Sequence, residues 1–221
     1  MKKHFRLLTL LIICLCALHN VFGQTSVNNF KDFREMKDKA QRLRDSKSYR
    51  TKTTTEKYAA DGTTLKEKIV STDEFAMPDR RFSSTTIESG GKTAKFEFIE
   101  IGEKVFVKED NGKWRIPRPE PITEPTEPTT GLGNTTGGKF IEQTTFNGQT
   151  VKVYEENTNT YFGDDGRSTT TRFWFNEAGE LLKTEAKERN LKTDEISRIV
   201  TIYEYDPNIK IEAPIKPDKK S

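Results

Sequence analysis

Cysteine and histidine, the side chains that most often act as nucleophiles, bases and metal ligands, occur only near the start of this chain. Both cysteines (Cys14 and Cys16) and both histidines (His4 and His19) lie within residues 1–23. Residues 24–221 therefore offer no cysteine nucleophile, no Ser-His-Asp triad, no histidine-bound metal and no disulfide. We expect neither a metal ion nor a cofactor in the folded protein.

Carboxylates are the remaining candidates for catalysis, and their spacing does not favour it. Glu155 and Glu156 are adjacent in a predicted strand, so they point to opposite faces and cannot act together. Asp164-Asp165-Gly166 lacks the D-x-D-x-D-G rhythm of a calcium loop and is typical of a turn. The serines have no partner base of the usual kind, and no nucleophile elbow, P-loop or dinucleotide fingerprint occurs. We predict no catalytic residues.

Residues 1–23 have the three-part pattern of a cleavable secretory signal. The segment begins with basic residues, continues through an apolar run from Leu7 to Leu18 and ends on the small residue Gly23. The apolar run is shorter than the roughly 20 residues that span a bilayer. We expect an exported protein, in the periplasm or otherwise extracellular, with no transmembrane segment in the mature chain.

Charge in the mature chain is balanced. Removing 23 residues from 221 leaves 198, enough for a single domain with a sizeable core. The first 23 residues hold three of the 37 basic residues and none of the 34 acidic ones, so the remainder is neutral. Because no basic excess or polybasic block remains, we expect no nucleic acid partner.

One amphipathic helix is predicted over residues 29–46. Phe30, Phe33, Met36, Ala40 and Leu43 recur at spacings of three and four, which places them on one stripe. This pattern indicates a helix that packs on a sheet, and it also fits a lid or plug over a cavity.

After Ser48 the sequence turns to Thr, Val, Ile and aromatic residues with recurring turn signals. Gly90-Gly91 and Asn147-Gly148 are among these signals, and such pairs favour the positive φ angles of tight hairpins. Strands this close together must pair antiparallel. We predict about nine or ten strands in meander order. The last strand, residues 195–205, is apolar on both faces and should be central.

A proline-rich segment interrupts the strands. Five prolines fall within residues 116–128, and Gly and Thr continue to Gly138. Proline removes ladder donors, so we predict a long exposed loop at 116–138, serving as a linker, a mobile flap or a partner-binding loop. Residues 24–215 then form one domain, and residues 216–221 a flexible tail.

Pairs of aromatic residues in the predicted strands are compatible with either a filled core or an open cavity. Phe96 and Phe98 share one strand face, and Phe173 and Phe175 share another. Such rings suit a filled sandwich or closed barrel, and they also suit an open, curved sheet whose aromatic concave face the helix covers. On periodicity alone we favour the filled core.

The order of elements resembles the LolA-like superfamily, which includes periplasmic lipoprotein carriers and mycobacterial lipid-binding lipoproteins of the LppX and LprG type. A signal and a helix lead into "SYRTKTTTEKY". The string "FIEIGEKVFVKEDNGKW" and the terminal strand leading into Ile209–Pro214 carry the most specific likeness. In one departure, the proline-rich loop stands where the family's carriers have lid helices.

The resemblance implies an α+β, mainly antiparallel fold: a half-open, curved β-barrel with the N-terminal helix packed on or in it. Its hydrophobic interior would receive acyl chains, with contacts from the helix and from the barrel wall. Which strand face is concave is left open by the sequence. The candidate cavity residues are Phe30, Phe33, Met36, Leu43, Phe96, Phe98, Phe173, Phe175, Val200 and Ile202.

Several functions are compatible with this reading. The favoured hypothesis is a non-enzymatic carrier that holds a lipid or the acyl chain of a lipoprotein. The alternative is an envelope sensor or protein-interaction module on the same fold, with an envelope protein as partner. A structural secreted domain and an Asp/Glu hydrolase are the less favoured readings.

Overall fold

A computed structural model describes residues 31–117, 132–162 and 165–215. The predicted signal at 1–23, Phe30 and the predicted tail at 216–221 lie outside these residues. Within the described part, no helix is both long enough and apolar enough to cross a bilayer.

One helix and ten strands make up the described fold. The helix occupies residues 31–46. The strands are β1 (Tyr49–Tyr58), β2 (Leu65–Ala76), β3 (Arg80–Ser89), β4 (Lys92–Ile101), β5 (Lys104–Glu109), β6 (Leu132–Phe146), β7 (Gln149–Phe162), β8 (Asp165–Asn176), β9 (Leu181–Asn190) and β10 (Ile196–Tyr205).

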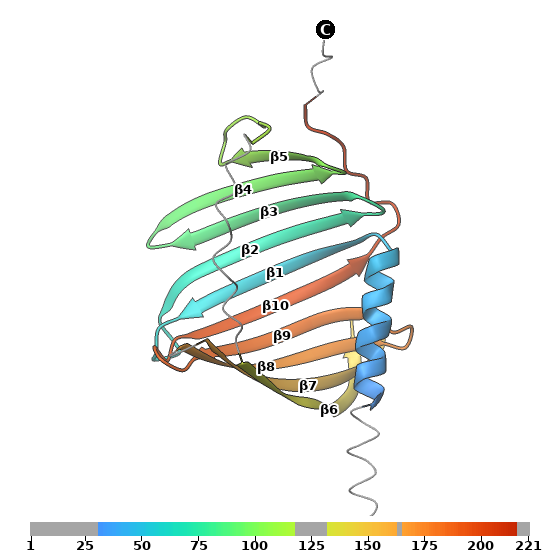
Figure 1. Ribbon diagram of the computed structural model, residues 1–221, viewed down its shortest axis with the longest axis vertical. Helices are drawn as coiled ribbons and strands as arrows, with labels where there is room; N and C mark the ends of the chain where they lie inside the picture. Colours follow the sequence, from blue (N-terminus) through green and yellow to red (C-terminus); the bar gives the residue numbers. More distant parts are fainter. Residues whose placement is uncertain (1–30, 118–131, 163–164, 216–221) are drawn as a thin grey trace, which may run out of the picture.

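All ten strands belong to one curved, antiparallel sheet that is not closed (Figure 1). Its order is β5-β4-β3-β2-β1-β10-β9-β8-β7-β6, so two five-strand meanders meet where β1 pairs with β10. The free edges are β5 and β6, which are neighbours in sequence. The prediction of a half-open antiparallel sheet of nine or ten strands with a helix on it is confirmed.

Local chemistry accounts for the hairpins and for the central strand. Asn147 and Gly148 adopt φ angles of 49° and 77°, as the turn between β6 and β7 requires. The β10 strand lies between β1 and β9, as its apolar character on both faces predicted.

Part of the range predicted as a proline-rich loop is a strand. We predicted a loop over 116–138, but β6 begins at Leu132, so the second part of that range is strand. The prolines end at Pro128, and glycine and threonine are tolerated in an edge strand, where one side needs no ladder partner. The segment between β5 and β6 therefore joins the two free edges of the sheet.

The two faces of the sheet differ in side-chain size. We call the side on which the helix packs the inner face; in the central strands it carries short side chains such as Thr51, Thr53 and Ser83. The outer face carries long charged ones, including Lys52 and Arg198. Because the helix packs on the inner face, we infer that the inner face is the concave one.

The helix forms the first of two cores. It crosses the ends of the strands from β10 toward β6 (Figure 1) and buries Phe33 and Ala40 against Tyr154, Phe175 and Leu181. The Phe33 ring lies 5.3 Å from the Tyr154 ring and 5.4 Å from that of Phe173. This aromatic cluster fills one end of the inner face.

The second core lies on the outer face at the opposite half of the sheet. Ile209 and Ile211, beyond β10, pack there against Ile99 and Phe106. The Arg80 guanidinium donates to the Ile211 carbonyl at 2.7 Å and fixes this segment. The chain following β10 thus covers the outer side of β3 to β5 and leaves their inner side open.

The helix packs closely against β6 at Gly138, where the Phe33 ring lies directly over the glycine. A Cβ built at this buried glycine would lie 1.8 Å from the Phe33 ring. We predict that Gly138→Ala lowers the free energy of unfolding by about 1–3 kcal/mol, because the ring or the strand must move. Urea unfolding checks this, with exposed Gly137→Ala as the control. Equal midpoints for Gly138→Ala and the native chain would show that the helix does not rest on β6.

Candidate functional site

A row of aromatic rings crosses the inner face beside the helix. Tyr205 of β10, Tyr49 of β1 and Phe75 of β2 follow one another, with ring centroids 6.0 Å and 4.6 Å apart. The Arg81 guanidinium then lies 5.1 Å from Phe75 and 4.8 Å from Phe98 of β4. The four rings, with the Arg81 guanidinium of β3 between the last two, therefore extend over five neighbouring strands, and we call this set the aromatic row.

Hydroxyl groups form the floor next to the aromatic row. Thr53 and Thr201 share a hydrogen bond of 3.0 Å, and Ser71 and Thr85 share one of 2.9 Å. These cross-strand pairs satisfy much of the hydrogen-bonding capacity of the small hydroxyls within the sheet. A weakly polar floor of this kind can face an alkyl chain at little desolvation cost.

Apolar side chains are exposed on the inner face at the β4–β5 edge. Phe96 is 44% exposed and Val105 is 36% exposed, and both lie on the face that carries the half-buried Phe98. Single exposed apolar residues are common, but a group of them on the concave side of a sheet marks a binding surface. This open half of the inner face can receive an apolar ligand.

Asp32 anchors the first turn of the helix to β7. The Tyr154 hydroxyl donates to Asp32 in a short hydrogen bond, and the Lys152 ammonium lies 3.4 Å from the same carboxylate. Burial raises the pKa of the Tyr154 phenol, and its bond to the Asp32 carboxylate raises it further. The phenol therefore stays protonated and serves as a donor that holds the helix on the sheet.

A hollow of about 270 Å³ lies between the helix and the inner face. Its apolar floor is made by Phe173, Phe175 and Leu181, and the helix contributes Lys37 and Arg44. The Lys37 ammonium is held 3.1 Å from Glu156 and 5.4 Å from the Phe173 ring. An apolar floor with cations above it suits an amphiphile more than a purely apolar molecule.

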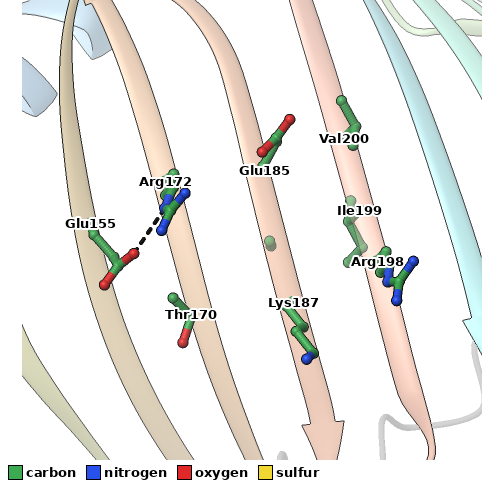
Figure 2. Close-up of a pocket in the computed structure, with 9 residues that line it drawn as sticks. Glu155, Thr170, Arg172, Glu185, Lys187, Arg198, Ile199 and Val200 are labelled. Atoms are coloured by element: carbon green, nitrogen blue, oxygen red, sulfur yellow. Dashed lines mark hydrogen bonds and ion pairs between the residues drawn. The ribbon is translucent and has the colours of Figure 1, made fainter. Parts of the chain in front are cut away.

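The outer face has a different depression, of about 470 Å³ (Figure 2). Figure 2 shows Glu155 and Arg172 paired across β7 and β8 at 2.8 Å, with Lys187 and Arg198 on the neighbouring strands. Ala186, Ile199 and Val200 line the depression beside these charged groups, so its surface is mixed. An alkyl chain placed here would also cover the charged groups and remove them from water, which is costly.

The predicted cavity residues fall into three groups. Phe33, Met36, Phe173 and Phe175 meet in the core under the helix, with Leu43 half-buried on the same helix. Phe96 and Phe98 lie on the open half of the inner face. Val200 and Ile202 lie on the opposite, outer face, because Thr201 between them points inward and pairs with Thr53.

The structure adds inner-face residues that the sequence did not single out. Tyr49, Phe75 and Tyr205 join the aromatic row only through the β10–β1–β2 pairings, which connect residues far apart in the chain. From the sequence alone, Arg44 is indistinguishable from an ordinary charged residue on the exposed side of a helix. Its half-buried place above the Tyr203 ring, 5.9 Å away, is visible only in three dimensions.

The carboxylate pair behaves as predicted. Glu155 points outward to Arg172 and Glu156 points inward to Lys37, so they cannot act on one substrate. Asp164 of the predicted turn lies outside the described residues. Among the residues that are described, no group of three or more acidic, histidine or cysteine side chains is placed to hold a metal ion.

The fold and the site define a half-open antiparallel barrel, capped by a helix at one end, with a partly open aromatic inner face. Solved structures of the LppX and LolA-like type are similar to this chain, as the sequence resemblance indicated. Lipoprotein LppX from Mycobacterium tuberculosis is 10% identical, with a TM-score of 0.46, over 80% of this chain and 97% of that one.

Two further solved structures have comparable coverage. LprF from Mycobacterium bovis is 8% identical, with a TM-score of 0.49, over 82% of this chain and 95% of that one. A domain assigned to outer membrane lipoprotein sorting, from Vibrio parahaemolyticus, is 10% identical, with a TM-score of 0.33, over 83% and 94%. No family model and no curated protein matches the chain. These likenesses concern the fold alone, so the chemistry of the site rests on the residues described above.

The buried tyrosines predict a fall in stability at alkaline pH. Burial raises the pKa of Tyr154, and it raises that of Tyr205 to about 12, above the ordinary value of 10.0. Above pH 10 the folded chain therefore holds more protons than the unfolded chain. We predict that the free energy of unfolding is fully retained below pH 10 and decreases above it.

Urea unfolding at a series of pH values on either side of 10 measures this decrease. Tyr154→Phe should cost about 1 kcal/mol at neutral pH through its lost hydrogen bond, and should reduce the decrease above pH 10. The control is Tyr161→Phe at an exposed position, which should change neither quantity. An unchanged alkaline slope in Tyr154→Phe would contradict the anchoring role of this phenol.

Proposed function

We propose that this chain is a non-enzymatic, exported binding protein that holds a lipid or another acylated ligand against the inner face of its sheet. The observation that carries the proposal is the exposed apolar group at the β4–β5 edge, which continues the aromatic row on the concave side. The helix and its core fill the other end of the same face. A ligand would complete the part of the inner face that the protein leaves uncovered.

The hydrophobic effect would supply the binding energy. An acyl chain that leaves water for an apolar surface gains about 0.8 kcal/mol per buried CH₂ group. The sheet does not close between β5 and β6, and we propose that a ligand reaches the inner face from this side. Release would need a membrane or a partner that offers an equally apolar site, as expected of a lipid or lipoprotein carrier.

The secretory pattern of residues 1–23 supports export, and we propose the periplasm as the location. The sequence of residues 24–221 has no cysteine or histidine and no recognised nucleophile motif, and on this ground we propose binding rather than catalysis.

Protein binding is the second candidate function, favoured by the two free edges of the sheet. Among the described strands, β6 (Leu132–Phe146) has a partner on one side only, whereas β5 gains a bridge between Val107 and Arg115. An extended segment of an envelope protein could add to β6 as a further strand. Such a partner would bind without occupying the aromatic row.

Acyl-chain binding predicts an effect of Phe96→Ser on affinity. This substitution removes part of the exposed inner-face surface, so it should weaken binding of the fluorescent fatty acid cis-parinaric acid by about 1 kcal/mol, or roughly fivefold in Kd. Stability should change by less than about 1 kcal/mol, because the ring is already 44% exposed. Fluorescence titration and urea unfolding of the same preparations give both quantities.

Leu191→Ser is the matched control for Phe96→Ser. Leu191 is also 44% exposed, but it lies in the turn between β9 and β10 rather than on the inner face. Binding by this variant should equal that of the native chain. Equal weakening in both variants, or an absence of saturable binding by the native chain, would refute acyl-chain binding on the inner face.

A further inference from the structure

Arg44 differs from other basic side chains on the inner face because it has no carboxylate partner. Five of those side chains each pair with a carboxylate at 2.6 to 3.4 Å. These pairs are Lys37–Glu156, Lys57–Glu67, Arg81–Asp73, Lys152–Asp32 and Arg167–Glu188. Within the described residues, no carboxylate lies within 4.0 Å of the Arg44 guanidinium. In the described part of the inner face, Arg44 is therefore a half-buried cation without a direct ion pair; the nearby Asp45 carboxylate accepts from Gln41 instead.

The surroundings of Arg44 are aromatic. Its guanidinium lies 5.9 Å from the Tyr203 ring and donates a hydrogen bond to a neutral partner, the Gln41 side-chain oxygen, at 2.5 Å. Burial raises the pKa values of Tyr49 and Tyr203, and the positive charge of Arg44 opposes that rise in both. These neighbours place the cation beside the rings of β1 and β10, on the inner side of the helix.

A half-buried cation among aromatic rings has lost part of its hydration shell. A bound anion would replace the hydrogen bonds that water no longer provides. Arg44 lies in the last turn of the helix, where the helix dipole stabilises its positive charge. A dipole does not, however, provide the charged hydrogen-bond acceptors that a guanidinium can bind. Asp38 also lines the hollow, from an exposed position on the helix. Arg44 thus keeps donors available toward the hollow whose floor is Phe173, Phe175 and Leu181.

We propose that Arg44 receives the anionic group of the ligand, a carboxylate or a phosphate, so that the ligand is an acidic amphiphile. This inference rests on the proposed function and names its ligand class. The apolar part of the ligand would lie along the aromatic row toward Phe98 and the exposed Phe96. The four strand-to-strand steps from β10 to β4 measure about 19 Å, a length that a long acyl chain can cover.

Paired probes that differ only in charge test this assignment. Oleate is compared with methyl oleate, and phosphatidylglycerol with the uncharged diacylglycerol of the same chains, each added to the full chain below its aggregation limit. We expect the native chain to bind each acid at least tenfold more tightly than its neutral partner. Arg44→Met should remove this preference by weakening the acids alone, and Arg44→Lys should retain part of it.

Arg42→Met is the matched control, because Arg42 is an exposed residue two positions away on the same helix. It should leave all four affinities unchanged. Inorganic phosphate alone should neither bind nor compete at millimolar concentration, since the apolar part anchors the ligand.

The outcomes separate this inference from the proposed function. Equal binding of the acids and their neutral partners, unaffected by Arg44→Met, would overturn the inference and leave acyl-chain binding intact. Saturable binding of none of the four probes would overturn both. Competition by inorganic phosphate would show a free-anion site and would also overturn the assignment to an amphiphile.

Discussion

The pairing of β1 with β10 is the interaction on which the rest of the structure depends. Ten residue pairs, from Tyr49 opposite Tyr205 to Tyr58 opposite Ile196, join two meanders that are built from local hairpins. This long-range pairing sends β5 and β6 to the two edges. A barrel would close if these edges paired with each other, but in the described strands they do not, so the sheet stays open on one side.

The open sheet has to cover its inner face by other means, and it covers only part of it. The helix fills one end with Phe33 and Ala40, held by Asp32 on Tyr154 and by the close approach to Gly138. The segment after β10 covers the outer face of the other half, where Ile209 and Ile211 pack. Phe96 and Val105 are left exposed on the inner side of that half. Because the hydrophobic effect would favour covering them, this region is where an apolar ligand would gain most.

Much of the fold could be predicted from short-range patterns in the sequence. Glycine-containing turns marked the hairpins, the stripe from Phe33 to Leu43 marked the helix, and the two apolar faces of residues 195–205 marked the central strand. The site was harder to predict from the sequence. Alternation of apolar and polar residues assigns side chains to the two faces of a strand, but it does not say which face is concave. Val200 and Ile202 were therefore predicted to line the cavity, and they lie on the face opposite to Thr201 and the aromatic row. The aromatic row and Arg44 depend on strand register and helix placement, which no local pattern reports.

Native mass spectrometry of the exported chain, purified from its own envelope without detergent, tests the central claim most directly. The account predicts a reproducible added mass that extracts into organic solvent and carries an acidic group on an acyl chain. A bare polypeptide mass, with no uptake of fatty acids or phospholipids when they are supplied, would contradict it. In that case the inner face would have to be completed by a protein partner or by the chain itself.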